Sequence, residues 1–401
     1  MSEILKVPKG ERVHIGFFGK VNSGKSSLVN AFLGEEVSIV SEIMGTTTDL
    51  VQRATEVFGI GPCLIIDTAG LEDESELSLA RLQKTELASQ QSDVAVILFN
   101  GEDISCELAL ARKFRELETP ILPIISKVDL ISNENELRAK IKKEAGLDAI
   151  ALSKFDNELR QKITEEIIKL IPDNEERLLC SGLAEAGDAV LLVMPQDREA
   201  PKGRLILPQA QTIRELIDKG CITICTDFEN MDNALARLNA PPKLIITDSQ
   251  IFKKVYLKKP KESLLTSFSI LFANYKGDIR YFADSAKAID SLKAGSRVLI
   301  SELCSHAPLE EDIGRIKIPH LLREKAGESI EIDFCRGTDF PIDAKSYDLI
   351  IECGGCMFGR KYIMSRVKKA RELKIPMTNY GIAIAYMNGI LGCVTLPKNE
   401  F

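Results

Sequence analysis

The chain carries the stretch Gly19-Lys20-Val21-Asn22-Ser23-Gly24-Lys25-Ser26, which fits the pattern GxxxxGKS and directly follows an apolar run at residues 13–18. Glycines let backbone N–H groups of such a loop converge on a phosphate, while Lys25 adds a positive charge and Ser26 a hydroxyl for Mg²⁺. We expect an apolar helix at residues 27–32 to start where the phosphate binds. The sequence therefore predicts a nucleotide site with contacts from Gly19, Asn22, Ser23, Gly24, Lys25, Ser26 and Ser27.

Two further segments are placed to complete a Mg²⁺ site. Asp67-Thr68-Ala69-Gly70 ends the apolar run 63–66, which puts the Asp67 carboxylate at the carboxyl end of a strand and Gly70 in the turn that follows. Upstream, residues 45–49 offer hydroxyls, Thr47 among them, on a loop that can close over Mg²⁺ and the γ-phosphate. We expect Ser26, Thr47 and Asp67 to hold the metal.

A third group of residues is placed to read the base. Ser126-Lys127-Val128-Asp129 follows the apolar run 121–125 and matches the signature NKxD, except that Ser replaces Asn. The Asp129 carboxylate can accept from the ring N–H and the exocyclic amine of guanine, a pattern that adenine lacks, while the stem of Lys127 covers the ring. Ser153 and Lys154 occupy the place of a last, weaker base-contact loop. The sequence therefore predicts GTP and GDP rather than ATP.

Length and composition bound the remaining possibilities. A chain of 401 residues suggests two or three domains, and 45% apolar with 28% charged residues is typical of folded protein. No apolar run reaches the ~20 residues of a membrane helix and the N-terminus does not resemble a signal peptide, so we expect a cytoplasmic protein without membrane contact. The net charge of −7 argues against nucleic-acid binding. Ten cysteines in such a compartment indicate buried thiols or metal ligands.

Strand-like and helix-like segments continue to alternate after residue 172. We expect domains at 1–172, 178–260 and 264–401, joined by polar linkers. The fold class is therefore α/β, with a P-loop GTPase domain followed by two smaller α/β domains whose sheets are mainly parallel. The middle domain carries no residues that suggest chemistry, so we expect it to mediate dimerisation. Strands are predicted at 189–194, 221–226, 243–247, 297–301, 329–334, 347–351 and 375–378.

Cysteines in the last domain follow two of these strands. Cys304-Ser305-His306 comes after 297–301, and Cys353-Gly354-Gly355-Cys356 comes after 347–351. Both therefore lie at the carboxyl ends of parallel strands, where α/β sheets form their ligand sites. Three thiolates and an imidazole would close a structural Zn²⁺ site, whereas three thiolates with a labile fourth position suit a [4Fe–4S] cluster. The residues alone leave both metals open.

Residues 10–172 resemble the TrmE-Era-EngA group of GTPases, on the four nucleotide motifs given above. That resemblance implies catalysis through Lys25, Asn22 and Thr47. Asn22 matches the asparagine that helps to hold K⁺ in potassium-activated members, which implies K⁺-stimulated hydrolysis. Leu71 replaces the glutamine that orients water in Ras-like GTPases, which implies slow intrinsic hydrolysis.

The CxH motif, a spacer of about 46 residues (307–352) and the CxxC motif, downstream of such a GTPase domain, resemble the HydF family of [FeFe]-hydrogenase maturation GTPases. This resemblance favours iron, with Cys304, Cys353 and Cys356 as ligands of a [4Fe–4S] cluster. The family often has His before the CxxC motif, whereas this chain has Glu352. The fourth cluster ligand is therefore open between His306, Glu352, a carboxylate from the middle domain and water.

The same resemblance implies a function and partners. The protein would be a scaffold that holds the diiron subcluster precursor and transfers it to apo-[FeFe]-hydrogenase, working with two radical-SAM maturases as a homodimer. Two alternatives stay open. One is a GTPase of ribosome or tRNA maturation with a structural Zn²⁺ site, and the other is a GTP-driven metallochaperone for simple Fe–S insertion.

Overall fold

The computed structural model describes residues 7, 9–33, 42–43, 51–68, 85–131, 133–153, 155–156, 158–171, 178–195, 205–303, 313–337, 340, 346–355 and 358–398. The chain divides into two compact units, Met1–Glu175 and Glu176–Phe401, and each is described by itself. Within the described ranges, no helix combines the length and the apolarity that crossing a membrane requires.

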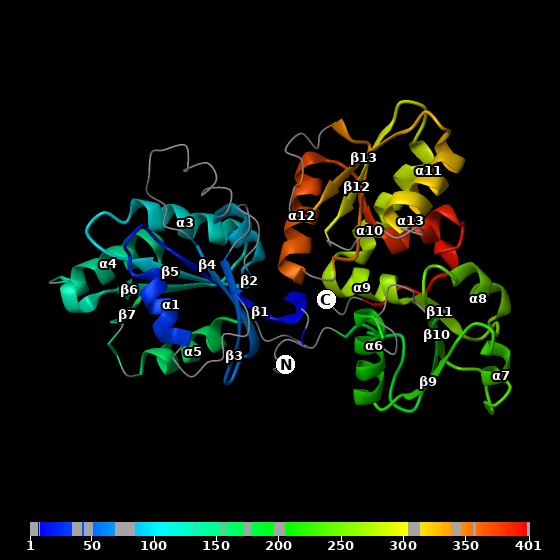
Figure 1. The fold of residues 1–401 in the computed structure, drawn as a ribbon, viewed down its shortest axis with the longest axis horizontal. Coiled ribbons are helices and arrows are strands. Elements are labelled where there is room, and N and C mark those ends of the chain that lie inside the picture. The colour runs from blue at the N-terminus through cyan, green and yellow to red at the C-terminus, as the bar shows by residue number, and fades with distance from the viewer. Residues whose placement is uncertain are drawn as a thin grey trace. The chain divides into compact units, whose positions relative to one another are not determined.

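The first unit is built on one mixed sheet (Figure 1). In the described residues, seven strands pair in the order β2-β3-β4-β1-β5-β6-β7. The β2–β3 and β3–β4 pairs are antiparallel and the other pairs are parallel. The strands are β1 Val13–Phe18, β2 Glu42–Ile43, β3 Val51–Val57, β4 Gly61–Asp67, β5 Val94–Phe99, β6 Ile121–Ser126 and β7 Ile150–Leu152.

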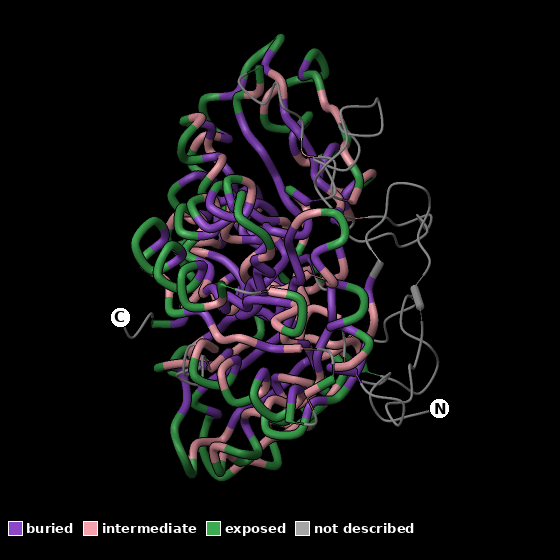
Figure 2. Tube along the Cα trace, turned by 90° about the vertical axis from the view of Figure 1, so that its left-hand side faces the viewer, coloured by how far each residue is buried: buried purple, intermediate pink, exposed green. Residues whose placement is uncertain are grey.

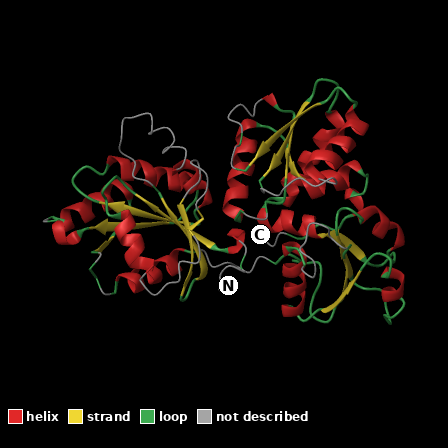
Figure 3. Ribbon diagram, in the orientation of Figure 1, coloured by secondary structure: helices red, strands yellow, loops and turns green. Residues whose placement is uncertain are grey.

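Helices cover both faces of this sheet (Figure 3). Apolar residues of α1 and α5 pack on one face, and those of α3 and α4 pack on the other. Central strands covered on both faces must be apolar throughout, which is why β5 and β6 are buried at every residue. The helices are α1 Lys25–Leu33, α3 Ser105–Glu116, α4 Glu134–Ala145 and α5 Leu159–Leu170.

The second unit contains two parallel sheets of four strands each in the described residues. The first has the order β11-β10-β8-β9 and the second the order β13-β12-β14-β15. Strands β8, β10, β12 and β14 are mostly buried, and Figure 2 colours buried residues purple. The strands are β8 Ala189–Val193, β9 Ile222–Thr226, β10 Leu244–Thr247, β11 Leu264–Ser267, β12 Arg297–Glu302, β13 Glu331–Arg336, β14 Leu349–Glu352 and β15 Met377–Asn379.

The helices of the second unit enclose these two sheets. Helices α6 and α9 pack on one face of the first sheet, and α7 and α8 pack on the other. Helices α11 and α13 cover one face of the second sheet. The helices are α6 Leu207–Asp218, α7 Met231–Leu235, α8 Phe252–Lys258, α9 Phe268–Lys276, α10 Ile279–Ala286, α11 Ile318–Ala326, α12 Arg360–Leu373 and α13 Tyr380–Met387.

The first sheet of this unit includes segments from beyond the middle domain predicted at 178–260. Strand β11 completes the first sheet, so that sheet extends past residue 260, where we expected the middle domain to end. The C-terminal segment also returns to it, because Thr395 N–H donates to Leu265 O at 2.8 Å. The fold class is confirmed: a P-loop domain is followed by α/β structure with parallel sheets.

Candidate functional sites

The phosphate-binding loop connects β1 to α1. Two glycines are required by its geometry, because a Cβ on Gly19 would lie 2.9 Å from Leu98 O and Gly24 has φ +89°. Lys25 Nζ donates to Gly19 O at 2.9 Å and to Lys20 O at 2.6 Å, which closes the loop on itself. Burial lowers the pKa of Lys25, and the carboxylates of Asp67 and Glu107 act in the opposite direction. The loop thus holds one cation at the place where phosphate charge is expected.

The metal side of the site joins α1 to β4. Register pairs Phe17 with Asp67, which places Asp67 at the carboxyl end of its strand beside the phosphate loop. Ser26 Oγ donates to Asp67 Oδ2 at 3.3 Å. Burial raises the pKa of Asp67, opposed by the hydrogen bond from Ser26 and the charges of Lys25 and Arg53. A hydroxyl and a carboxylate therefore meet as Mg²⁺ coordination requires.

The loop predicted to read the base, residues 126–129, contacts the phosphate-binding loop. Ser126, which replaces the Asn of the signature, is buried and its Oγ donates to Ser23 O at 2.7 Å. Lys127 has a left-handed backbone (φ 56°), and its Nζ donates to Asn22 O at 2.6 Å. A Cβ on Gly24 would lie 3.5 Å from Lys127 Cε, so the lysine stem lies over the loop. Ser126 thus supplies a hydroxyl link between the two loops.

Asp129 and Ser153 meet because β6 and β7 are neighbours in register. Ser126 pairs with Leu152, which brings the residues after each strand to the same sheet edge. Ser153 Oγ donates to Asp129 Oδ1 at 2.8 Å, which fixes the carboxylate that would read guanine. Ser27 lies exposed in the first turn of α1. Thr47, Gly70, Leu71 and Lys154 lie outside the described residues.

The cysteine-bearing edge of the second unit is formed by β12 and β14. These strands are parallel neighbours with Ser301 opposite Glu352, and Cys353 N–H donates to Ser301 O at 2.9 Å. Leu303 N–H in turn donates to Cys353 Sγ at 3.1 Å. The residue that precedes Cys304 therefore contacts Cys353 directly. An N–H donor to sulfur is the contact that a thiolate ligand takes in iron–sulfur proteins.

The side chain of Glu352 forms an ion pair with Arg366 of α12. Its Oε2 lies 2.6 Å from Arg366 Nε, and the side chains of Glu352 and Arg366 are 2% and 3% exposed. Arg366 Nη2 also donates to Ser301 Oγ at 2.6 Å. Burial raises the pKa of Glu352, and the charge of Arg366 acts in the opposite direction. This carboxylate therefore already has a cationic partner.

The other predicted ligands, Cys304, His306 and Cys356, lie outside the described residues. Among the residues that the structure does describe, no three His, Cys, Asp or Glu side chains gather to hold a metal ion. The described thiols are free, and they are not uniformly buried as we expected. Cys63 and Cys180 are buried, whereas Cys225 and Cys393 are exposed.

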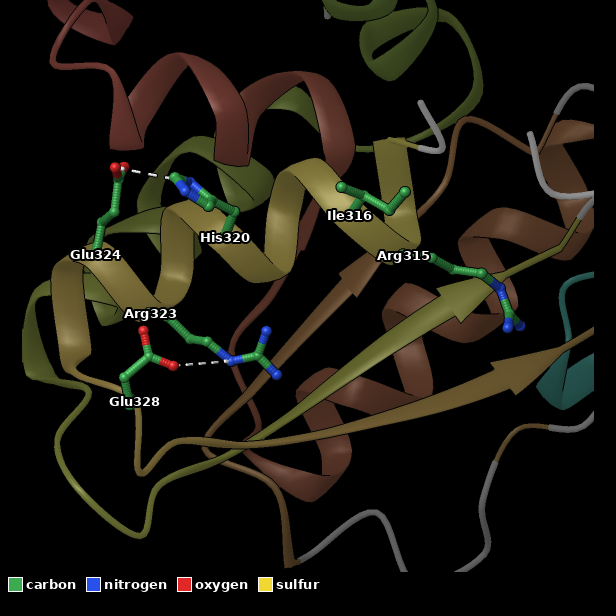
Figure 4. A pocket seen from close by; sticks show the side chains of 6 residues that line it. All are labelled: Arg315, Ile316, His320, Arg323, Glu324 and Glu328. Atoms are coloured by element: carbon green, nitrogen blue, oxygen red, sulfur yellow. Dashed lines mark ion pairs between the residues drawn. The ribbon is translucent and has the colours of Figure 1, made fainter. Parts of the chain in front are cut away.

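A pocket of about 350 Å³ lies elsewhere in the second unit (Figure 4). Its lining comes from residues 313–328: Arg315, Ile316, His320, Arg323, Glu324 and Glu328. Its polar groups lie in pairs, since His320 Nδ1 lies 3.6 Å from Glu324 Oε1 and Arg323 Nε lies 3.7 Å from Glu328 Oε2. None of the predicted site residues lines this pocket.

Sequence reasoning missed two charged residues beside the cysteine edge, Arg366 and Lys276. Both are almost fully buried. Lys276 Nζ donates to Phe358 O at 3.0 Å. A lysine at the end of an apolar run usually reaches solvent, so no sequence signal could have identified this one.

Comparison with protein-family models divides the chain into three matched segments. Residues 14–127 match the model described as 50S ribosome-binding GTPase. Residues 179–277 match the hydrogen maturase F dimerization domain, and residues 280–396 match the hydrogen maturase F tetramerization domain.

Individual relatives each match a part of the chain. The tRNA modification GTPase MnmE of Endomicrobium trichonymphae is 34% identical over 149 residues, 34% of this chain and 32% of that protein. GTPase Der of Clostridium botulinum is 36% identical over 140 residues, 33% of this chain and 32% of that protein. The chain thus spans about a third of the length of these curated relatives. A crystal structure of Aquifex aeolicus Era bound to GDP and AlF4⁻ matches with TM-score 0.34 and 24% identity, covering 40% of this chain and 57% of that one.

Proposed function

Because the chain belongs to the hydrogen maturase F family, we propose that it is a GTP-hydrolysing scaffold that binds a [4Fe–4S] cluster and delivers a diiron subcluster precursor to apo-[FeFe]-hydrogenase. The observation that carries the cluster site is the 3.1 Å hydrogen bond from Leu303 N–H to Cys353 Sγ. The parallel pairing of β12 with β14 places Leu303 and Cys353 at the same edge of the sheet, which supports the proposal.

The cluster ligands would be Cys304, Cys353 and Cys356. A bound [4Fe–4S] cluster would supply an iron with a replaceable fourth ligand, to which cargo can attach. The chain's own contribution is to hold the Cys353 sulfur beside a backbone N–H donor and next to the glycine pair 354–355. Because thiolate donors also suit Zn²⁺, the metal analysis described below distinguishes iron from zinc.

We propose that Glu352 is not the fourth cluster ligand. Its carboxylate is paired with Arg366 in a nearly solvent-free site, and withdrawing it would leave a buried guanidinium without its counter-charge. We therefore favour His306, a carboxylate from elsewhere or water at this position. A nitrogen or oxygen ligand on a soft cluster iron is easily displaced, which suits a carrier.

GTP would act as the switch that changes contacts with partner proteins. In this proposal Lys25 and the loop backbone hold the phosphates, Ser26, Thr47 and Asp67 hold Mg²⁺, and Asp129 reads guanine. Intrinsic hydrolysis would be slow, because Leu71 cannot orient the attacking water. K⁺ bound beside Asn22 would stimulate it. Support comes from the contacts among the described members of this set, above all Ser26 with Asp67 and Ser153 with Asp129.

The family match supports a proposal about assembly and partners. The two matched models carry dimerization and tetramerization in their printed names, which supports a homo-oligomer. We propose a homodimer as the basic form and two radical-SAM maturases and the apo-hydrogenase as partners.

Metal analysis after anaerobic reconstitution tests the function. Iron and sulfide in equal amounts, with a cluster EPR signal on reduction, are the expected result. Stoichiometric zinc without iron would instead support a GTPase of RNA or ribosome maturation with a structural metal site.

A nucleotide-site variant separates the two activities. Lys25→Ala removes the charge that closes the phosphate loop, so it should abolish GTP hydrolysis and leave iron content unchanged. Parallel loss of iron and hydrolysis would count against two separate sites.

A further inference from the structure

Lys276, the last residue of α9, is 2% exposed, and its ammonium group lies against the loop that follows Cys353. Its Nζ donates to Gly355 O at 3.3 Å and to Phe358 O at 3.0 Å. These two carbonyls lie on either side of residues 356–357. One buried side chain thus contacts the described residues that precede and follow positions 356–357.

Arg360, the first residue of α12, makes the reciprocal contact. Its Nη1 donates to Tyr275 O at 3.1 Å and to Gly277 O at 2.7 Å. Carbonyl groups at the C-terminus of a helix have no partner within the helix and attract cations, which is the case for α9 here. Two cations therefore cross between the end of α9 and the cysteine loop, and we name Lys276 and Arg360 the clamp.

The loop itself is tightly packed where the clamp holds it. Gly355 has φ +58°, and a Cβ there would lie 2.7 Å from Ile363 Cδ1 and 3.1 Å from Leu303 Cδ1. Leu303 is also the residue whose N–H donates to Cys353 Sγ. The positions of Lys276, Gly355, Leu303 and Cys353 are therefore linked through direct contacts.

The clamp also crosses the boundary between the two matched family segments. Lys276 lies in the segment matched as dimerization domain, whereas Cys353 and Arg360 lie in the segment matched as tetramerization domain. We propose that Lys276 is a positioning residue for the cysteine loop and that its charge raises the reduction potential of a cluster bound there. This proposal rests on the cluster function proposed above.

The electrostatic part follows from charge and burial. Reduction adds one negative charge to a cluster, and a nearby cation in a low-dielectric site stabilises the more negative state. Lys276→Met keeps a long side chain and removes the ammonium. Its cluster should therefore be harder to reduce, which appears as a more negative midpoint in an EPR-monitored titration.

The positional part can be measured without iron. In the metal-free protein, alkylation of Cys353 by iodoacetamide, followed by peptide mass spectrometry, reports how often the loop opens. Loss of one hydrogen bond of typical strength should raise that rate by about fivefold or more in Lys276→Met. Lys259→Met is the matched control, because Lys259 Nζ also donates to turn carbonyls of the same unit, Pro260 O and Ser263 O, away from the cysteines.

Arg360→Met provides a second variant should Lys276→Met fail to fold, and it should shift alkylation in the same direction by a smaller factor. The proposal is supported when Lys276→Met, but not Lys259→Met, raises Cys353 alkylation and lowers the midpoint. It is overturned when folded Lys276→Met matches the wild type in either readout, and if that variant does not fold, Arg360→Met is judged by the same criterion. Wild-type protein that takes up no iron would instead refute the cluster function, while the alkylation result would still decide the positioning role.

Discussion

Arg366 Nε lies 2.6 Å from Glu352 Oε2, and this nearly solvent-free pair involves the residue that immediately precedes Cys353. Two charges in such a site stabilise each other only while both are present. The Arg366 guanidinium also donates to Ser301 Oγ, and its Cζ lies 4.4 Å from the centroid of the Phe340 ring. The residue before the CxxC motif therefore has a structural partner in this chain.

Glu352→Gln should destabilise the second unit. Leaving the Arg366 charge unpaired in a buried site costs about 3–5 kcal/mol, measured as the free energy of unfolding in urea. Glu331→Gln is the control, since the Glu331 side chain is 64% exposed in its pair with Arg297 and its loss should cost under about 1 kcal/mol. We expect folded Glu352→Gln protein to keep its full iron content. Loss of iron from folded protein would restore Glu352 as a ligand candidate.

Ser126→Ala should weaken GDP and GTP binding. It removes the hydrogen bond to Ser23 O that ties the base-reading loop to the phosphate loop. A loss of about 1 kcal/mol, or roughly fivefold in Kd by calorimetry, is expected. The control is Ser92→Ala, because Ser92 Oγ donates to Ala88 O and is equally buried but not part of the site. Equal effects of the two substitutions would show that only general stability is being measured.

Asp129→Asn should change base selectivity. The carboxylate that accepts from guanine would become an amide that can donate to the oxygen of xanthine at the same ring position. Losing two charge-assisted hydrogen bonds should weaken GTP binding by about a hundredfold, with xanthosine triphosphate binding better than GTP. Competition of the two nucleotides for the variant gives the readout. Unchanged preference for GTP would remove Asp129 from base recognition.

Nucleotide binding in the presence of Mg²⁺ should depend on pH through Asp67. Mg²⁺ needs the ionised carboxylate, and burial raises the pKa of Asp67, so protonation begins at a higher pH than the ordinary aspartate value of about 3.9. Affinity should therefore fall as the pH is lowered toward that range, starting above it. Titrations of Mg·GDP across this window measure it. Asp67→Asn should bind weakly and without this pH dependence, and a wild-type-like pH profile in that variant would assign the effect to another group.

Much of the fold follows from local patterns in the sequence. The apolar run 121–125 forms most of β6, which is buried at every residue, and the GxxxxGKS loop has a strand before it and a helix after it. Residues 264–276 carry no local signal that separates strand from helix. There a strand passes into helix α9 with no Gly or Pro between them, and the change depends on Ser267, whose Oγ accepts from Ile270 N–H. That is why the boundary expected at residue 260 falls inside a sheet.

The candidate sites divide in the same way. Asp129, Ser153 and Lys25 could be predicted because motif spacing places them at one sheet edge. Lys276 and Arg366 could not, since a charged residue within an apolar pattern gives no indication of which distant carbonyl or carboxylate it meets. Those contacts arise from tertiary packing of α9 and α12 rather than from local sequence.

Iron content of Cys353→Ser, compared with that of Cys335→Ser, tests the central claim most directly. Cys335 lies on β13 in the same sheet, outside the predicted ligand set, and serves as the matched thiol control. After anaerobic reconstitution, the wild type and Cys335→Ser should each bind about four iron atoms per chain, and Cys353→Ser should lose the cluster EPR signal and most of its iron. A full complement of iron in Cys353→Ser would contradict the account.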